Sequence, residues 1–105
     1  LHWHITDAES WPAGSLLFPQ LARAAAFSPQ AVYTLDEMQA LVRYAQLRGI
    51  RVVPELDLPA HTSIGKAFPN LASKSCASQI NPLAPSLYHF LGSLLTEMGS
   101  VFTGF

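Results

Sequence analysis

The feature that most constrains the fold is a short apolar segment, near the middle of the chain, that runs directly into ionisable side chains. Ile50, Val52 and Val53 are β-branched apolar residues just after a glycine, a pattern typical of a strand. Glu55, Asp57 and His61 follow, separated by prolines that resist helix and central-strand geometry. In (β/α)8 barrels, the active site lies at the C-terminal ends of such strands. We therefore predict a strand that ends in a functional loop; a turn whose polar groups cap neighbouring backbone is the alternative.

The rest of the chain alternates strand-like and helix-like segments. Residues 1–6 alternate apolar and polar side chains, which predicts the tail of a strand. Residues 34–49 open with the capping-box pattern TLDE, continue with core-facing apolar spacing and end at a glycine, which predicts a helix. The strand over residues 50–56 follows at once. A second helix is predicted over residues 85–101, with a proline in its first turn. Its predicted apolar stripe consists of Leu87, Leu91, Leu94, Leu95 and Met98.

Long connections occur only on the strand-to-helix side of this order. Residues 8–31, with a turn of helix around residues 21–26, and residues 57–84 are predicted as loops that are rich in proline. Strand–helix–strand–helix alternation predicts an α/β fold with a parallel sheet and helices packed outside it. The unequal loop lengths predict a single functional face.

Composition excludes some classes of function. Half of the 105 residues are hydrophobic, 12% are charged and the formal net charge is −1. This balance predicts globular material and no binding of nucleic acid. No apolar run approaches the roughly 20 residues of a membrane span, so none is expected. The apolar surplus and the abrupt ends of the chain predict a fragment. The single Cys76 is a buried thiol, a free thiol or half of a bridge to absent sequence.

Several motifs in one order resemble glycoside hydrolase family 20, the β-N-acetylhexosaminidases. They are HWHITD at residues 2–7, SWP at residues 10–12, YAQLRGIRVVPE at residues 44–55, INP at residues 80–82 and SVF at residues 100–102. Asp57, Pro59 and the His61-Thr62 pair continue the match, which covers essentially the whole chain.

The resemblance implies a partial (β/α)8 TIM barrel, from about the end of strand 2 to helix 3. Residues 1–105 are then a fragment of a family 20 catalytic barrel and no complete domain. The implied parent is an exo-β-N-acetylhexosaminidase that removes terminal N-acetylglucosamine or N-acetylgalactosamine by substrate-assisted retention. The family's catalytic Asp-Glu pair at the next strand is missing here, since Asp36-Glu37 belongs to a helix cap. The fragment alone is therefore expected to be inactive.

The resemblance also implies site residues. Asp7 and His61 match a dyad behind the catalytic acid, in which the carboxylate fixes the imidazole and the imidazole contacts the acid. Glu55, Asp57 and His4 are expected to support the dyad through hydrogen bonds. Trp11 is the candidate for the rim of the substrate site, whereas Trp3 is expected in the core. No metal and no cofactor are expected.

Two rival hypotheses stay open. His2 and His4 on one strand face could begin the site of a metal-dependent barrel hydrolase, although histidines hydrogen-bonded to neighbours are the favoured interpretation. The chain departs from the family pattern at Ala8, where an acid is usual, and at Ala60, where a glycine is usual. Ala60 is expected to strain a loop that needs a positive φ. These departures permit a non-catalytic sugar-binding relative.

Partners and location are implied by the resemblance alone. The expected partner is a glycan or a chito-oligosaccharide, and the parent could form a homodimer or heterodimer. A lysosomal or secreted location is expected. Cys76 matches a position at which animal members have a half-disulfide whose partner lies beyond the end of this chain, with a buried thiol as the alternative.

Overall fold

The computed structural model of the protein describes residues 1–103 and confirms the predicted order of strand, helix, strand and helix. Its elements are β1 (His2–Thr6), α1 (Gln20–Ala25), α2 (Leu35–Gln46), β2 (Val53–Leu56), α3 (Ile64–Ala67), the 3-10 turn η1 (Pro69–Leu71) and α4 (Leu87–Val101). β1 and β2 pair in parallel, as the α2 crossover between them predicts. The chain is therefore α/β.

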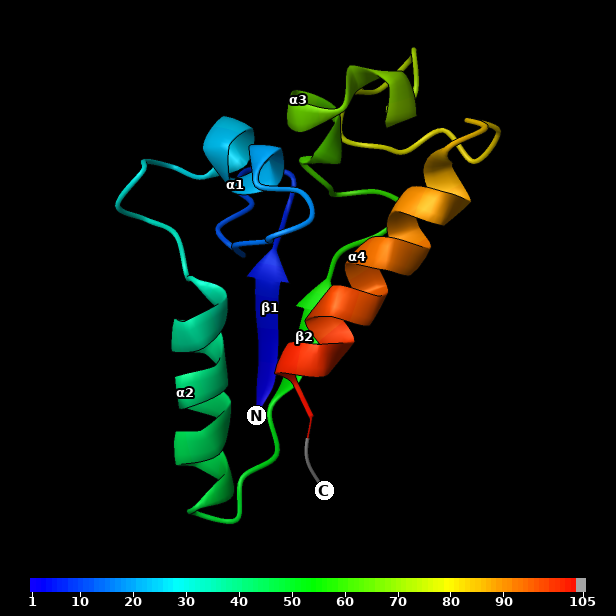
Figure 1. Cartoon of the computed structure of the whole chain (residues 1–105). Helices are drawn as coiled ribbons and strands as arrows, with labels where there is room; N and C mark the ends of the chain where they lie inside the picture. Colours follow the sequence, from blue (N-terminus) through cyan, green and yellow to red (C-terminus); the bar gives the residue numbers. More distant parts are fainter. Residues whose placement is uncertain (104–105) are drawn as a thin grey trace.

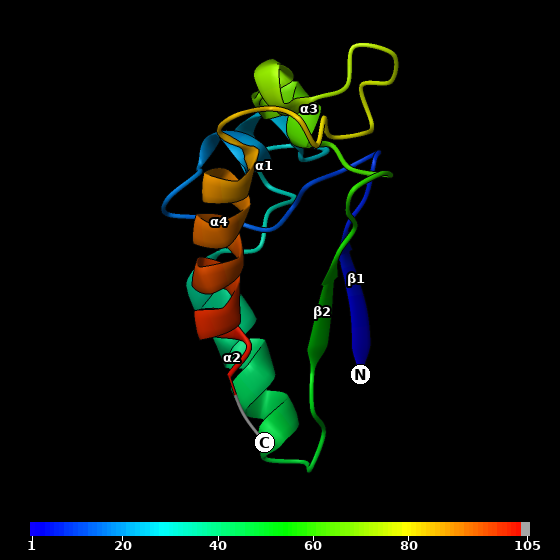
Figure 2. The same cartoon turned by 90° about the vertical axis from the view of Figure 1, so that its right-hand side faces the viewer.

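The two long helices cover one face of the two-stranded sheet. Figure 1 shows the strands between α2 and α4, and the view in Figure 2 places both helices on the same side of the sheet. The shorter elements α1 and α3 lie beyond the carboxyl ends of the strands, together with the long connecting loops. Within residues 1–103 no helix covers the opposite face. None of the helices in this part of the chain has the length and apolarity to cross a bilayer.

A bulge interrupts the sheet at the end of β1. His4 is the register partner of Glu55, but Thr6 rather than Ile5 is the partner of Leu56, so β1 has one extra residue there. Ile5 and Thr6 are consequently both buried, at 3% and 1% exposure. The predicted alternation therefore holds from His2 to Ile5 and fails at Thr6, because the bulge turns the threonine inward. Leu1 precedes the strand and is 65% exposed.

The capping box predicted for α2 is confirmed. The Glu37 amide donates to the Thr34 hydroxyl at 3.2 Å, and the Thr34 amide donates back to the Glu37 carboxylate at 2.8 Å. The bond from the Thr34 amide, and one that the Thr34 hydroxyl donates to the same carboxylate at 2.9 Å, lower the pKa of Glu37. The helix gives way to a turn that ends at Gly49, whose φ of +68° is a conformation that glycine adopts without strain.

The core lies between the sheet and the helices and extends under the loops. α4 contributes Leu87, Phe90, Leu94, Met98 and Val101 to it. The prediction that Leu95 belongs to the buried stripe of this helix is wrong, because its side chain is 51% exposed. Phe90 takes part in the core instead, because it completes an aromatic cluster with Phe18 and Phe68 whose ring centroids lie 4.5–6.0 Å apart.

Two predicted segments differ from the structure. The strand expected from residue 50 begins only at Val53, since residues 50–52 carry the chain from the α2 turn to the sheet edge. The segment 57–84 holds α3 and η1 in place of a featureless loop. These elements are four and three residues long, too short to display a helical period in sequence.

Gly65 permits the close packing of α3 against the loop that follows it. A Cβ at Gly65 would lie 2.7 Å from the carbonyl oxygen of Ala77 and 2.9 Å from the Cβ of Ala72. Gly92 in α4 provides a contrast, since a Cβ there would have nothing within 4 Å.

We expect Gly65→Ala and Gly92→Ala to change stability in opposite directions. The first forces backbone apart and should lower the free energy of unfolding by about 1–3 kcal/mol. The second removes a flexible glycine from a helix and should raise it by about 0.5–1 kcal/mol. Thermal melting of both variants, in the protein that carries this chain, measures the difference. Equal melting temperatures would contradict the packing described for Gly65.

Candidate functional site

The polar side chains singled out in the sequence gather where the two parallel strands end. His4 and Glu55 face each other across the sheet as register partners, and Asp7 and Asp57 follow β1 and β2 directly. This edge carries the long loops, and His61 lies on the second of them. These polar side chains therefore gather at the edge of the sheet where the sequence predicts the functional face.

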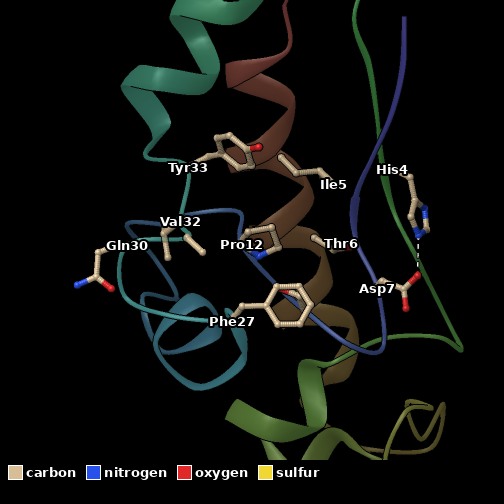
Figure 3. A pocket seen from close by; sticks show the side chains of 11 residues that line it. His4, Ile5, Thr6, Asp7, Pro12, Phe27, Gln30, Val32 and Tyr33 are labelled. Carbon is tan, nitrogen blue, oxygen red and sulfur yellow. Dashed lines mark hydrogen bonds and ion pairs between the residues drawn. The ribbon is translucent and has the colours of Figure 1, made fainter.

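A chain of ion pairs joins the side chains of His2, Glu55, His4 and Asp7. The ring of His4 has Nδ1 at 2.9 Å from Oε1 of Glu55 and Nε2 at 2.8 Å from Oδ2 of Asp7. The other carboxylate oxygen of Glu55, Oε2, contacts Nε2 of His2. Figure 3 shows His4 reaching Asp7 on the side of β1 away from Pro12 and Phe27. Both histidines are thus hydrogen-bonded to neighbours, as the favoured interpretation predicted.

The charges in this chain stabilise each other. The hydrogen bond to Asp7, and then that to Glu55, raises the pKa of His4 above its usual value. The bond from His4 lowers the pKa of Asp7, and the bonds from His4 and His2 lower the pKa of Glu55. At neutral pH both carboxylates are therefore ionised.

The backbone around the two aspartates is fixed by buried hydroxyl groups. The amide of Asp57 donates to Oγ1 of Thr6 at 3.2 Å, and Thr6 is 1% exposed. The hydroxyl of Ser63, also 1% exposed, donates to the carbonyl oxygen of Asp7 at 2.8 Å. These bonds tie the loop after β1 to the loop after β2.

The structure does not bring the predicted dyad of Asp7 and His61 together. Among residues 1–103, Asp7 is paired with His4, and no hydrogen bond or ion pair connects it to His61. Nδ1 of His61 lies 3.9 Å from Oδ2 of Asp57, and the His61 side chain is 78% exposed. The difference has a local cause: Asp7 and His4 are three residues apart on the same bulged strand end.

The expectation for Ala60 is wrong, and the unusual backbone belongs to the next residue. His61 has a φ of +53°, whereas Ala60 has no positive φ and forms an antiparallel bridge with Gln79. A non-glycine residue in this left-handed region costs on the order of 1–3 kcal/mol and persists only where the surrounding structure holds it. The backbone strain of this loop is therefore located at His61, which is itself a predicted site residue.

The expectation that Trp11 lies at the rim of the site is also wrong. Trp11 is 0% exposed and belongs to the main core cluster, with its amide hydrogen-bonded to the carbonyl oxygen of Ala25. The loop folds back over α1 and carries the indole inward. Trp3 is in the predicted place, because it packs edge-on against Tyr33 and Phe102.

A pocket of about 430 Å³ lies beside the end of β1. It is lined by His4, Asp7, Ser10, Phe27, Tyr33 and their neighbours, and Figure 3 shows most of these side chains. Glu55, Asp57 and His61 do not line it. The pocket and the ion-pair chain therefore share only His4 and Asp7.

One group of site residues has spacing that a divalent ion could use. His4, Asp7 and Asp57 each offer one nitrogen or oxygen within 4.8 Å of the others. Both ring nitrogens of His4 are already bonded to carboxylate oxygens. For that reason we assign His4 and Asp7 to the ion-pair chain, whereas Asp57 lies outside it and its carboxylate is near His61.

Glu97 is a structural residue that the sequence did not indicate. Its carboxylate accepts hydrogen bonds from the amides of Leu16 and Leu17 at 2.8 and 3.1 Å, and from the Ser15 hydroxyl. The partners are about eighty positions apart in sequence, so no local pattern could reveal them. This bond set anchors the loop after β1 to α4.

Cys76 is a free and partly exposed thiol in the described residues. Its sulfur lies 3.3 Å from the Ser78 hydroxyl, and this contact lowers the pKa of the thiol. The alternative of a fully buried thiol is therefore wrong, while the bridge beyond the chain stays a prediction.

Comparisons with known proteins agree with one another. The sequence model of the glycosyl hydrolase family 20 catalytic domain matches residues 1–104. The β subunit of β-hexosaminidase from Felis catus is 40% identical over 97% of this chain and 21% of its own length. The chain thus spans about a fifth of the length of the curated relatives it matches.

Solved structures give the same result. The chitobiase of Flavobacterium johnsoniae superposes with a TM-score of 0.88 and 32% identity over 98% of this chain and 17% of that one. The exo-β-N-acetylglucosaminidase of Vibrio harveyi, solved with N-acetylglucosamine, superposes with a TM-score of 0.83 and 26% identity. This match covers 96% of this chain and 20% of that one.

We expect Thr6→Val to release the loop that carries Asp57. Valine keeps the shape of threonine but cannot accept the Asp57 amide, which should then exchange with solvent faster than in the parent. Thr6→Ser retains the hydroxyl and is the matched control. Hydrogen exchange at residue 57, followed by NMR or mass spectrometry, makes the comparison. Unchanged protection in Thr6→Val would show that this bond does not hold the loop.

Proposed function

This chain belongs to glycosyl hydrolase family 20, and on that premise we propose that it is part of an exo-β-N-acetylhexosaminidase. The enzyme would remove terminal, non-reducing N-acetylglucosamine or N-acetylgalactosamine from glycans or chito-oligosaccharides. The observation that carries the proposal is the family match over residues 1–104.

We propose that the chain forms part of a (β/α)8 barrel. In this interpretation β1 is the end of the second barrel strand, α2 the second helix, β2 the third strand and α4 the third helix. Two features support it: the helices lie on one face of the parallel sheet, and the ionisable side chains gather at the carboxyl ends of the strands. The bare face, with His4 and Glu55, would then point into the barrel.

The chemistry we propose is substrate-assisted. The acetamido oxygen of the sugar attacks C1 and displaces the leaving group, which receives a proton from a glutamic acid supplied by sequence outside this chain. The adjacent aspartate of that pair orients the acetamido group. This chain would contribute Asp7 and His61, which hold and tune the acid. Alone, it should have no hydrolytic activity.

The dyad requires His61 to change partner. In the structure its ring lies near Asp57, and the loop is strained at this residue. We propose that the acid of the complete site draws the exposed ring from Asp57 toward Asp7. Asp57 and Glu55 then act in support: Asp57 through the Thr6 bond, and Glu55 through its bond to His4.

Partner and location follow from the same proposal. The names of the relatives as β-hexosaminidase subunits α and β favour a parent that assembles as a homodimer or heterodimer. A lysosomal or secreted compartment is expected, in which Cys76 would be oxidised. This part of the proposal is independent of the dyad.

Asp7→Asn and His61→Phe in the full-length enzyme should each lower kcat on an aryl N-acetylglucosaminide, with smaller effects on KM. General acid catalysis contributes about 10²–10⁴ in rate, and disabling the residues that tune the acid should remove a sizeable part of it. Because the two act as one unit, the double variant should be scarcely slower than the slower single variant.

His89→Phe is the matched control, because His89 is an exposed histidine on α4, outside the site. It should leave kcat unchanged. Losses that multiply fully in the double variant, or near-normal kcat in either single variant, would refute the dyad.

A further inference from the structure

His4 differs from the other histidines of the described chain because both of its ring nitrogens face a carboxylate. Nδ1 lies 2.9 Å from Glu55 on the neighbouring strand, and Nε2 lies 2.8 Å from Asp7 at the end of its own strand. One ring thus connects the two strand ends at their carboxyl edge, a contact visible in part in Figure 3.

The donor count of the ring determines its state. A neutral imidazole has one N–H donor and one acceptor, so it can satisfy only one of two ionised carboxylates. An imidazolium has two donors and satisfies both. The geometry therefore selects the cation, which is consistent with the raised pKa of His4.

The bond to His4 leaves part of Asp7 available. Oδ2 is occupied by the ring, whereas Oδ1 receives a long bond, 3.4 Å, from the Glu9 amide, and the Ala8 amide also interacts with the carboxylate. A carboxylate can accept hydrogen bonds at both oxygens. Asp7 can therefore stay bonded to His4 through one oxygen and accept His61 through the other.

We propose that His4 is a positioning residue: bridging Glu55 and Asp7 as an imidazolium, it turns the second oxygen of Asp7 toward the place where His61 must bind. The inference rests on the hexosaminidase function proposed above and adds a third member to the dyad. It assigns Glu55 an indirect role, because this carboxylate keeps His4 charged.

The bridge has a pH dependence of known sign. The folded-state pKa of His4 is raised and those of the two carboxylates are lowered, so the cation and both bonds are present between these pKa values and are lost as the pH rises through that of His4. The bridge should therefore contribute to the alkaline limb of kcat. The ionisable groups near the ring are its two bonded carboxylates, Asp57 within 4.8 Å and Tyr33 in the same pocket. One contact further away, His2 bonds Glu55 and His61 faces Asp57.

The test uses the full-length enzyme and three variants. His4→Gln removes the cation and should lower kcat about tenfold with little change in KM, because it affects a group that tunes the acid and not one that binds sugar. Glu55→Gln keeps the shape of the site but removes the charge that stabilises the cation, and should move the alkaline limb down by about one pH unit. His89→Gln is the control, because His89 is exposed on α4 and does not contact this cluster, so it should leave the profile in place.

The outcomes separate this inference from the proposed function. A parental pH profile in Glu55→Gln, with Asp7→Asn still impaired, would overturn the role of His4 and leave the hexosaminidase intact. No hydrolysis by the parent enzyme itself would overturn the proposed function. If His4→Gln does not fold, which thermal melting would reveal, the isosteric Glu55→Gln variant decides alone.

Discussion

The parallel pairing of β1 with β2 is the interaction on which the rest of the structure depends. Its register places His4 opposite Glu55, and its bulge carries Thr6 inward to receive the amide of Asp57. A shift of one residue would turn every side chain of a strand to the opposite face. The ion pairs at the strand ends therefore depend on the backbone hydrogen bonds between the strands, because these set the register that brings the charged side chains together.

Features that repeat locally could be predicted from sequence. The alternation in β1, the capping box of α2 and the apolar spacing of α4 each involve neighbours a few positions apart, and the structure contains all three elements. The gathering of polar groups at one edge also followed, because parallel strands bring their carboxyl ends together. Family motifs added the roles of particular residues, which spacing alone did not supply.

Features set by distant contacts could not be predicted in this way. Trp11 is in a proline-rich loop that looks exposed in sequence, and only the fold of that loop over α1 buries it. The pairing of Asp7 with His4 depends on a bulge that strand periodicity does not reveal. The positive φ predicted for residue 60 occurs at His61, and Ala60 instead forms a bridge with the distant Gln79.

The bonds of Glu97 to the loop after β1 have a consequence for how such a fold can be rearranged. The loop belongs to the first strand–helix unit and its anchor to the second, so neither unit is an independent module. If the second unit were replaced by that of a relative, two amides and a hydroxyl would lose their acceptor unless the incoming helix also carried a glutamate at position 97. The boundary between the two strand–helix units is therefore a poor place to recombine relatives, although the order of the elements alone would suggest that it tolerates exchange.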